Sequence, residues 1–178
     1  MIALRRTTMG ELEALVDLAA PPEVARLEPW KASHVRALAD RLRVDAPRLN
    51  GLRVVLAVLE VHDLVRDALA RVLPSVGAEV ILLGSGTPIA GVISAASEED
   101  ADAVVIGVYN GNALAVGERL VAEARTLGWD GTIYMGGILN QDTGEALPID
   151  ARPGLAELGI HCVERVEDLL QLLTTSPA

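Results

Sequence analysis

The alternation of short apolar runs with helical stretches after Gly51 is the feature that most constrains the fold. Five runs rich in Val, Ile and Leu have the length of strands: Arg53–Leu59, Glu79–Leu83, Ala103–Val108, Thr132–Met135 and His161–Val163. The stretches that follow them have helical patterns: Leu64–Leu73, Ile89–Ser97, Ala113–Leu127, Pro153–Leu158 and Val166–Leu173. Such alternation is typical of a parallel sheet covered on both faces. The sequence therefore predicts an α/β fold, a flavodoxin-like (Rossmann-like) five-stranded parallel sheet with helices on both faces.

The first fifty residues differ from the rest of the chain. We expect a helical extension over residues 1–50 and a single α/β domain over residues 51–178. Met9–Ala19 and Trp30–Arg43 both have helical patterns. An apolar stripe recurs at helical spacing in the second of them. Its members are Val35, Leu38, Ala39 and Leu42. Two short helices cannot form a core alone, so they must pack on the following domain, on a second copy of the chain or on a partner protein.

Charge and composition exclude several classes of partner. The net charge of −10 argues against nucleic acid, whose binders normally carry a basic surface. No apolar run approaches the roughly 18–20 residues that cross a membrane. The apolar stretch of a secretory signal does not follow Arg5 and Arg6, so we expect no such signal. The single cysteine, Cys162, fits a reducing compartment. We therefore expect a cytoplasmic protein that binds neither nucleic acid nor a membrane.

Polar or glycine-bearing loops follow the first four predicted strands. In a parallel sheet these loops all lie at one edge, where ligands bind at the point of strand-order reversal. Glycines at that edge let a ligand approach the backbone closely. The first loop also contains a histidine, His62. From the residues alone, this imidazole could ligate a metal, transfer a proton or have no chemical role.

Several familiar sites are excluded because their motifs are missing. The chain has no Gly-x-x-x-x-Gly-Lys-Ser/Thr phosphate loop and no Gly-x-Gly-x-x-Gly after the first strand. A response-regulator receiver needs an acid after the third strand, where this chain has Tyr109. Cys162 has no base at a recognisable spacing, because the adjacent His161 faces the opposite side of its strand. We interpret Cys162 as a small buried hydrophobic residue.

Residues 51 to about 173 resemble the cobalamin-binding domain, most closely the small subunit of glutamate mutase and the corresponding domain of acyl-CoA mutases. The family has Asp-x-His-x-x-Gly after the first strand, Ser-x-Leu after the third and Gly-Gly after the fourth. At these places this chain has Glu60-Val61-His62-Asp63-Leu64-Val65, Gly107-Val108-Tyr109 and Gly136-Gly137. The resemblance implies that His62 is the lower ligand of cobalt and that Glu60 orients His62 by a hydrogen bond. The cofactor-binding residues that it implies are Glu60, His62, Asp63, Val65, Gly84, Gly107, Tyr109, Asn110, Gly111, Gly136 and Gly137.

Three positions depart from the family pattern. Val65 stands in place of a glycine, Gly107 in place of a serine and Tyr109 in place of a leucine. Three interpretations follow. Cobalamin binds with His62 on cobalt and its nucleotide tail in a modified groove; or it binds with its own base on cobalt; or the groove is closed and the chain is a regulatory or protein-interaction module.

The resemblance also implies a role. The expected protein is the cofactor-carrying subunit of an adenosylcobalamin-dependent carbon-skeleton mutase, or a corrinoid carrier, with adenosylcobalamin favoured over methylcobalamin. The chain has no room for the barrel in which the rearrangement takes place, so it would not be a complete isomerase. We expect a separate barrel-type catalytic subunit as partner, or self-association through the N-terminal helices.

Overall fold

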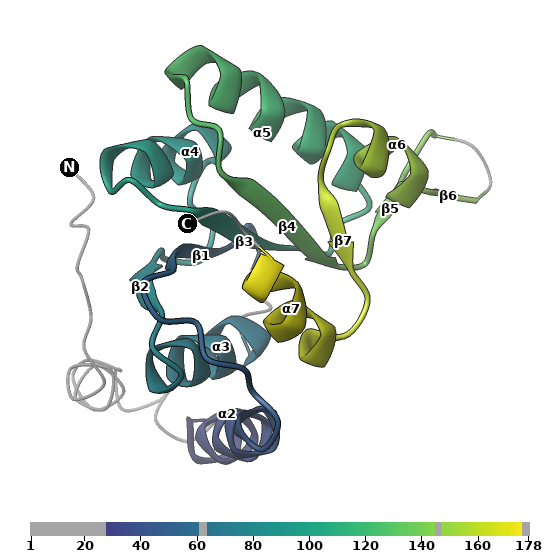
Figure 1. The fold of residues 1–178 in the computed structure, drawn as a ribbon. Helices are drawn as coiled ribbons and strands as arrows, with labels where there is room; N and C mark the ends of the chain where they lie inside the picture. Colours follow the sequence, from purple (N-terminus) through teal and green to yellow (C-terminus); the bar gives the residue numbers. More distant parts are fainter. Residues whose placement is uncertain (1–27, 61–63, 145–146, 176–178) are drawn as a thin grey trace.

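The computed structural model describes residues 28–60, 64–144 and 147–175, with side chains from residue 31 onward. Its centre is a five-stranded parallel sheet in the order β2-β1-β3-β4-β7 (Figure 1). The strands are β1 (Arg53–Val58), β2 (Glu79–Leu82), β3 (Ala103–Val108), β4 (Thr132–Gly137) and β7 (His161–Val163). This is the predicted flavodoxin-like sheet, and the strand order reverses between β1 and β3.

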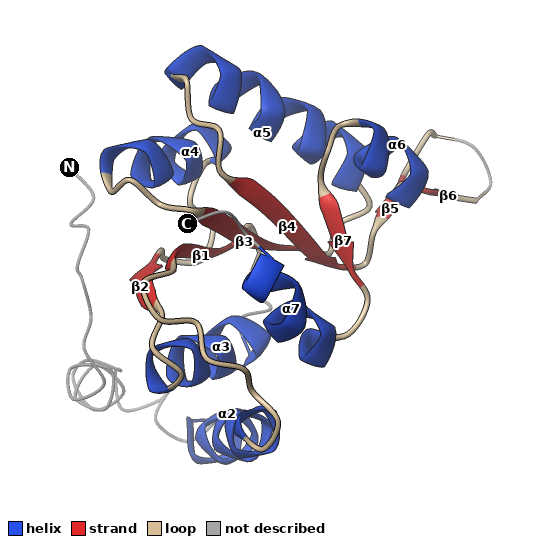
Figure 2. Ribbon diagram, in the orientation of Figure 1, coloured by secondary structure: helices blue, strands red, loops and turns tan. Residues whose placement is uncertain are grey.

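Helices cover both faces of the sheet (Figure 2). One face carries α3 (Leu64–Ser75) and α7 (Val166–Leu172), which is followed by the short η2 (Leu173–Thr175). The other face carries α4 (Ile89–Glu98), α5 (Ala113–Leu127) and α6 (Arg152–Glu157). Alternate strand residues enter two separate apolar layers, because successive side chains of a strand point to opposite faces. On β1, for example, Val55 belongs to the α4–α5 layer and Leu56 to the α3–α7 layer.

The N-terminal helix α2 (Glu28–Arg43) packs outside α3 and joins the core of the domain. Val35, Ala39 and Leu42 of its predicted stripe are buried in the α3–α7 layer. Lys31 also forms an ion pair with Asp67 of α3 at 3.0 Å. The sequence left three packing partners open for this helix: the α/β domain that follows it, a second copy of the chain or another protein. The structure shows it packed on the α/β domain. The predicted helix Met9–Ala19 lies outside the described residues.

Every predicted helix and strand within the described residues agrees with the observed boundaries to within two residues, and β3, α5 and β7 agree at both ends. The clear omission is a small antiparallel hairpin, β5 (Asn140–Gln141) with β6 (Ile149–Asp150), between β4 and α6. Two-residue strands show no alternating pattern, so local sequence could not reveal them. The hairpin lies at the same end of the sheet as the loops after β3 and β4, with which it exchanges backbone hydrogen bonds.

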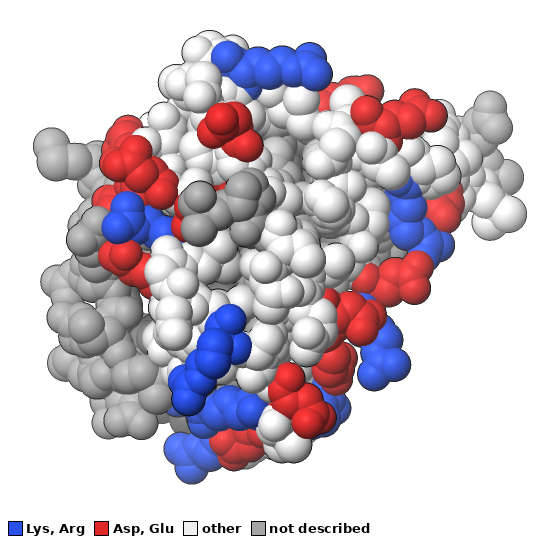
Figure 3. Space-filling model, in the orientation of Figure 1, with Lys and Arg blue, Asp and Glu red and all other residues white. Residues whose placement is uncertain are grey.

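On the face in Figure 3, Lys and Arg side chains lie beside acidic ones rather than in a continuous basic patch. Ion pairs between such neighbours include Arg41–Glu167 at 3.2 Å and Arg53–Glu79 at 2.9 Å. Within the described ranges, none of the helices is both long enough and apolar enough to cross a bilayer.

Candidate functional site

The carboxyl ends of β1, β3, β4 and β7 bring four residues into one row. The register pairs Val58 with Gly107, Gly107 with Gly136, and Gly136 with Val163. Directly below lies a second row on the same face, where Leu56 pairs with Val105 and Val105 with Tyr134. Because the middle of the upper row is two adjacent glycines, these strand positions contribute no side chain and leave a trough, which the ring of Tyr109 borders at Gly107. Val58 and Val163 form the two sides of this trough.

A cavity of about 260 Å³ lies over the trough, between the sheet and helices α3 and α7. It is slightly smaller than the roughly 300–1,000 Å³ of typical small-molecule sites. Apolar residues make up most of its wall. The lining residues outside the two rows are Ala57, Val65, Arg66, Leu69, Ile106, Tyr109, Gly137, Ile138, Glu164, Val166 and Leu169. The cavity is present with valine at position 65 and tyrosine at position 109, so these departures do not close it.

Gly107, Gly136 and Gly137 differ in how much space the structure leaves for a Cβ atom. A Cβ on Gly136 would meet its nearest neighbour, the carbonyl oxygen of Val163, at an ordinary 3.5 Å, so alanine is sterically allowed there. A Cβ on Gly107 would be tighter, 3.2 Å from Val58 Cγ2 and 3.3 Å from Tyr109 Cε2. Gly137 has φ +111°, and its Cβ would overlap the carbonyl oxygen of Val108. Gly136 thus keeps the cavity open, whereas Gly137 permits the backbone turn beside it.

Tyr109 and Glu60 place a polar pair beside the apolar cavity. Burial, and secondarily the negative charge of Glu60, raise the pKa of Tyr109 above its usual value. The Oε2 atom of Glu60 is buried and has no hydrogen-bond partner among the described residues. A buried carboxylate oxygen without a donor is costly. Glu60 therefore offers an acceptor to a group that the described residues do not supply.

We expect the phenol of Tyr109 to ionise above pH 10, and Glu60→Gln to move this ionisation down. The tyrosinate absorbance of the wild type minus that of Tyr109→Phe isolates the group during a pH titration. Since folding raises the pKa, the stability gained from the neutral phenol is present below the unfolded value of about 10 and is lost as the pH rises through the folded value. An unchanged midpoint in Glu60→Gln would contradict the proximity of the two charges.

The structure brings together only some of the residues predicted from sequence. Val65, Gly107, Tyr109, Gly136 and Gly137 all line the cavity. Gly84, Asn110 and Gly111 lie in loops at the same edge but outside its lining.

Two further predicted residues, His62 and Asp63, lie outside the described residues. They belong to the three-residue segment 61–63 that joins Glu60 to α3. Within the ranges that the structure describes, no three His, Cys, Asp or Glu side chains gather as metal ligands would. Ligation by His62 therefore stays a prediction.

Sequence reasoning missed several residues of the cavity. Tyr134 forms part of its floor, is 1% exposed, and donates a hydrogen bond from its hydroxyl to the carbonyl of Leu172 at 3.1 Å. Its place two residues before Gly136, on the same face of β4, was the available signal. Arg66 was also missed, although it directly follows Val65. The contributions of β7 and α7 depend on long-range packing and carry no local signal.

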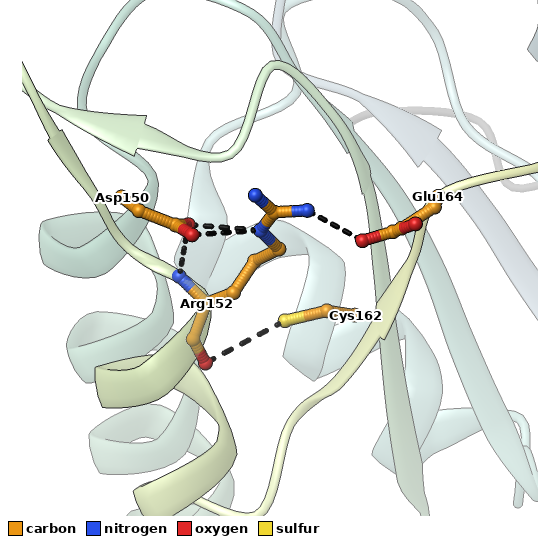
Figure 4. A network of polar contacts seen from close by, with 4 residues as sticks. All are labelled: Asp150, Arg152, Cys162 and Glu164. Carbon is orange, nitrogen blue, oxygen red and sulfur yellow. Dashed lines mark hydrogen bonds and ion pairs between the residues drawn. The ribbon is translucent and has the colours of Figure 1, made fainter.

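A second, more open hollow of about 600 Å³ adjoins the cavity and shares Gly137, Ile138, Val163 and Glu164 with it. Arg152 stands in its wall between two acids, with Nε 2.9 Å from Asp150 and Nη1 bonded to Glu164 (Figure 4). Hydrogen bonds from Arg152 lower the pKa of Asp150.

Cys162 lies close to this network, with its thiol 4.0 Å from the carbonyl of Arg152. Burial is the main reason that the pKa of the Cys162 thiol is raised. The thiol is therefore poorly suited to nucleophilic chemistry, because the thiolate is the reactive form. The side chain is half-buried rather than buried and packs against the α4–α5 layer, as a small hydrophobic residue would.

Comparison with known proteins identifies the family. The chain is similar in structure to a cobalamin-binding protein from Desulfitobacterium hafniense DCB-2, with a TM-score of 0.57 and 18% sequence identity over 70% of this chain. The match spans 58% of that protein, and at this identity it shows the shared fold. No curated protein matches the chain. The family model for the B12 binding domain matches residues 52–156, more than half of the sequence and including β1, β3, β4 and the cavity floor. The chain therefore belongs to the B12-binding domain family.

Proposed function

We propose that this protein carries cobalamin for a separate catalytic subunit, with the nucleotide tail of the cofactor in the cavity and His62 as the lower ligand of cobalt. The trough at Gly107 and Gly136 is the observation that carries this proposal. It places two strand positions that carry no side chain under a mostly apolar cavity, at the sheet edge where this fold binds ligands. Residues 1–50 would then be an extension that packs on the carrier domain, residues 51–178.

The chemistry of the cavity suits the heterocyclic base at the end of the tail. A flat aromatic base needs a narrow slot with apolar walls, and adjacent glycines remove the side chains that would block it. Tyr134 supplies an aromatic ring in the floor of this slot. Offset or edge-to-face contact between aromatic rings adds to the gain from burial. The adjoining hollow beside the β5–β6 hairpin would give room for the edge of the macrocycle.

The polar groups near the cavity suit a ligating histidine. An imidazole that binds a metal normally donates its other ring N–H to a carboxylate or carbonyl, which fixes the tautomer and raises the basicity of the ligand. The Oε2 atom of Glu60 is a buried acceptor with no partner among the described residues, and His62 is two positions along the chain. We assign this acceptor to His62. Tyr109, whose pKa the charge of Glu60 helps to raise, would then border the same contact.

The protein would bind the cofactor and hold its cobalt through His62, and the cofactor would supply the reaction chemistry. Bound adenosylcobalamin provides homolytic radical chemistry, which the chain itself does not perform. In this role the protein keeps the tail buried and presents the cofactor at the open edge of the sheet. The substrate site would lie on a barrel-type partner. Adenosylcobalamin is favoured over methylcobalamin because the resemblance to mutase subunits is closer than that to methyl carriers.

Retention of cobalamin tests the proposal. Purified protein is incubated with hydroxo-, methyl- or adenosylcobalamin, desalted, and measured by ultraviolet–visible spectroscopy beside His62→Ala. We expect the wild type to retain the corrinoid and His62→Ala to change its spectrum. Retention with an identical spectrum in both would show that the cofactor keeps its own base on cobalt. A folded wild type that retains no corrinoid would overturn the carrier role and favour a regulatory or protein-interaction module.

A further inference from the structure

The wall of the cavity contains a cationic side chain that the proposed function does not yet use. Arg66, the third residue of α3, lines the cavity, and its side chain is only 13% exposed. Glu164 is the other charged residue in the described lining, and its carboxylate bonds to Arg152 on the side of the second hollow. An arginine in a mostly apolar lining is a suitable partner for an anionic group of the ligand.

The guanidinium is held between α3 and the loop after β2. Its Nη1 donates to the hydroxyl of Ser85 at 2.8 Å, while Nε and Nη2 donate to Oδ1 of Asp67 at 3.0 and 2.6 Å. The other oxygen of Asp67 lies 3.0 Å from Nζ of Lys31 on α2. Lys31 can therefore hold Asp67 when Arg66 turns toward an anion. The hydroxyl of Ser85 is a neutral partner, which a charged acceptor replaces at a gain.

The nucleotide tail of cobalamin brings such an anion, because a phosphodiester links its ribose to the corrin side chain. We propose that Arg66 binds this phosphodiester and makes the groove select corrinoids with a complete nucleotide tail, an inference that rests on the proposed function. Guanidinium groups match phosphate oxygens in geometry and stay charged at every relevant pH. Low-polarity surroundings strengthen the attraction between the charges.

The placement of Arg66 in the cavity supports this role. A base lying over Gly107 and Gly136 rests on the sheet, and α3 covers the cavity from the opposite side. Arg66 lines the cavity from the first turn of α3 and follows His62 by four positions in the sequence. Leu69 lies one turn further along and lines the deeper, apolar part. The helix thus presents a charged residue at its first turn and an apolar residue beyond it. This order matches a tail whose base lies deepest in the cavity and whose phosphodiester lies nearer the entrance.

A comparison of two ligands and two arginines tests the proposal. Dissociation constants are measured by equilibrium dialysis for cobalamin and for cobinamide, which lacks the nucleotide and its phosphodiester. The proteins are the wild type, Arg66→Gln, Arg66→Lys and the matched control Arg71→Gln, which changes an arginine of the same helix outside the cavity lining. Each protein is first checked for folding by far-ultraviolet circular dichroism. Salt dependence in the wild type provides a second measurement that needs no variant.

We expect Arg66→Gln to weaken cobalamin binding about tenfold, the scale of one charge-assisted contact, and cobinamide binding less than about twofold. Arg66→Lys should recover part of the loss, and Arg71→Gln should match the wild type. Added NaCl should weaken cobalamin binding to the wild type more than to Arg66→Gln. Equal losses for both ligands, or no loss for either, would overturn the assignment while leaving the carrier role standing. A wild type that binds neither ligand would overturn both.

Inorganic phosphate is the probe that shows whether the site prefers the nucleotide tail or binds any phosphate. If phosphate alone raised the thermal midpoint of the wild type as much as cobalamin does, the site would be a general anion site and the assignment to the tail would fail. We expect phosphate alone to have a much smaller effect than cobalamin, because it leaves the trough empty.

Discussion

Gly136→Val should abolish retention of cobalamin while leaving the protein folded. A Cβ at this position meets only ordinary contacts, and a β-branched residue suits a strand, so the backbone of β4 tolerates the change. The new side chain would occupy the trough over which the base of the tail must lie. Gly136→Ala should weaken binding about tenfold, or about 1.4 kcal/mol, and the loss should grow with the bulk of the side chain. Desalting followed by absorbance spectroscopy measures both.

The matched control for this series is Gly91→Ala. Gly91 lies in α4, on the opposite face of the sheet, and its Cβ would meet a single neighbour, the methyl group of Thr87 at 3.3 Å. Alanine in place of glycine inside a helix is favourable by itself. We expect this variant to bind cobalamin as the wild type does. Full retention of cobalamin by a folded Gly136→Val would show that the tail does not use the trough.

Gly137→Ala, in contrast to Gly136→Val, should strongly lower the stability of the fold. Its φ of +111° is strained for any residue with a Cβ, and the added atom would overlap the carbonyl oxygen of Val108. That carbonyl cannot easily move, because it accepts a hydrogen bond from the N–H of Ile138 at 2.9 Å. We expect the free energy of unfolding to fall by about 2–4 kcal/mol, measured by urea unfolding followed by circular dichroism.

Gly136→Ala is the matched control for Gly137→Ala, since it adds the same methyl group one residue earlier without strain. Its free energy of unfolding should stay within about 1 kcal/mol of the wild type. Equal stability losses for the two variants would contradict the division of roles between these neighbouring glycines. It would mean that both serve the backbone and neither is reserved for the ligand.

The sheet and its layers could be predicted because the strands are buried on both faces. Buried parallel strands have continuous apolar sequences, and the intervening helices have clear periodicity, so both signals are local. The β5–β6 hairpin escaped prediction because strands of two residues carry no pattern. The packing of α2 on α3 was one of three open alternatives. The apolar stripe of α2 predicts that one helix face is buried, but not which surface buries it.

The cavity was only partly predictable, for a related reason. Gly107, Tyr109, Gly136 and Gly137 follow strands whose carboxyl ends must meet at one edge, so the topology brings them together. Tyr134, Val163 and Leu169 line the same cavity through the packing of α7 and β7 over the sheet, which local sequence does not encode. The effect of Val65 also needed the structure. A valine in place of the family glycine suggested a blocked groove, whereas it forms part of a wall around an open cavity.

Electron paramagnetic resonance identifies the lower ligand of cobalt and so distinguishes His62 from the cofactor's own base. Protein labelled uniformly with nitrogen-15 is loaded with unlabelled cob(II)alamin and studied by electron paramagnetic resonance. If His62 ligates cobalt and the tail lies in the cavity, each cobalt line splits into a doublet from the labelled imidazole, and the doublet disappears in His62→Ala. A triplet from the unlabelled base of the cofactor would rule out ligation by His62, because that base would then be on cobalt rather than over Gly107 and Gly136.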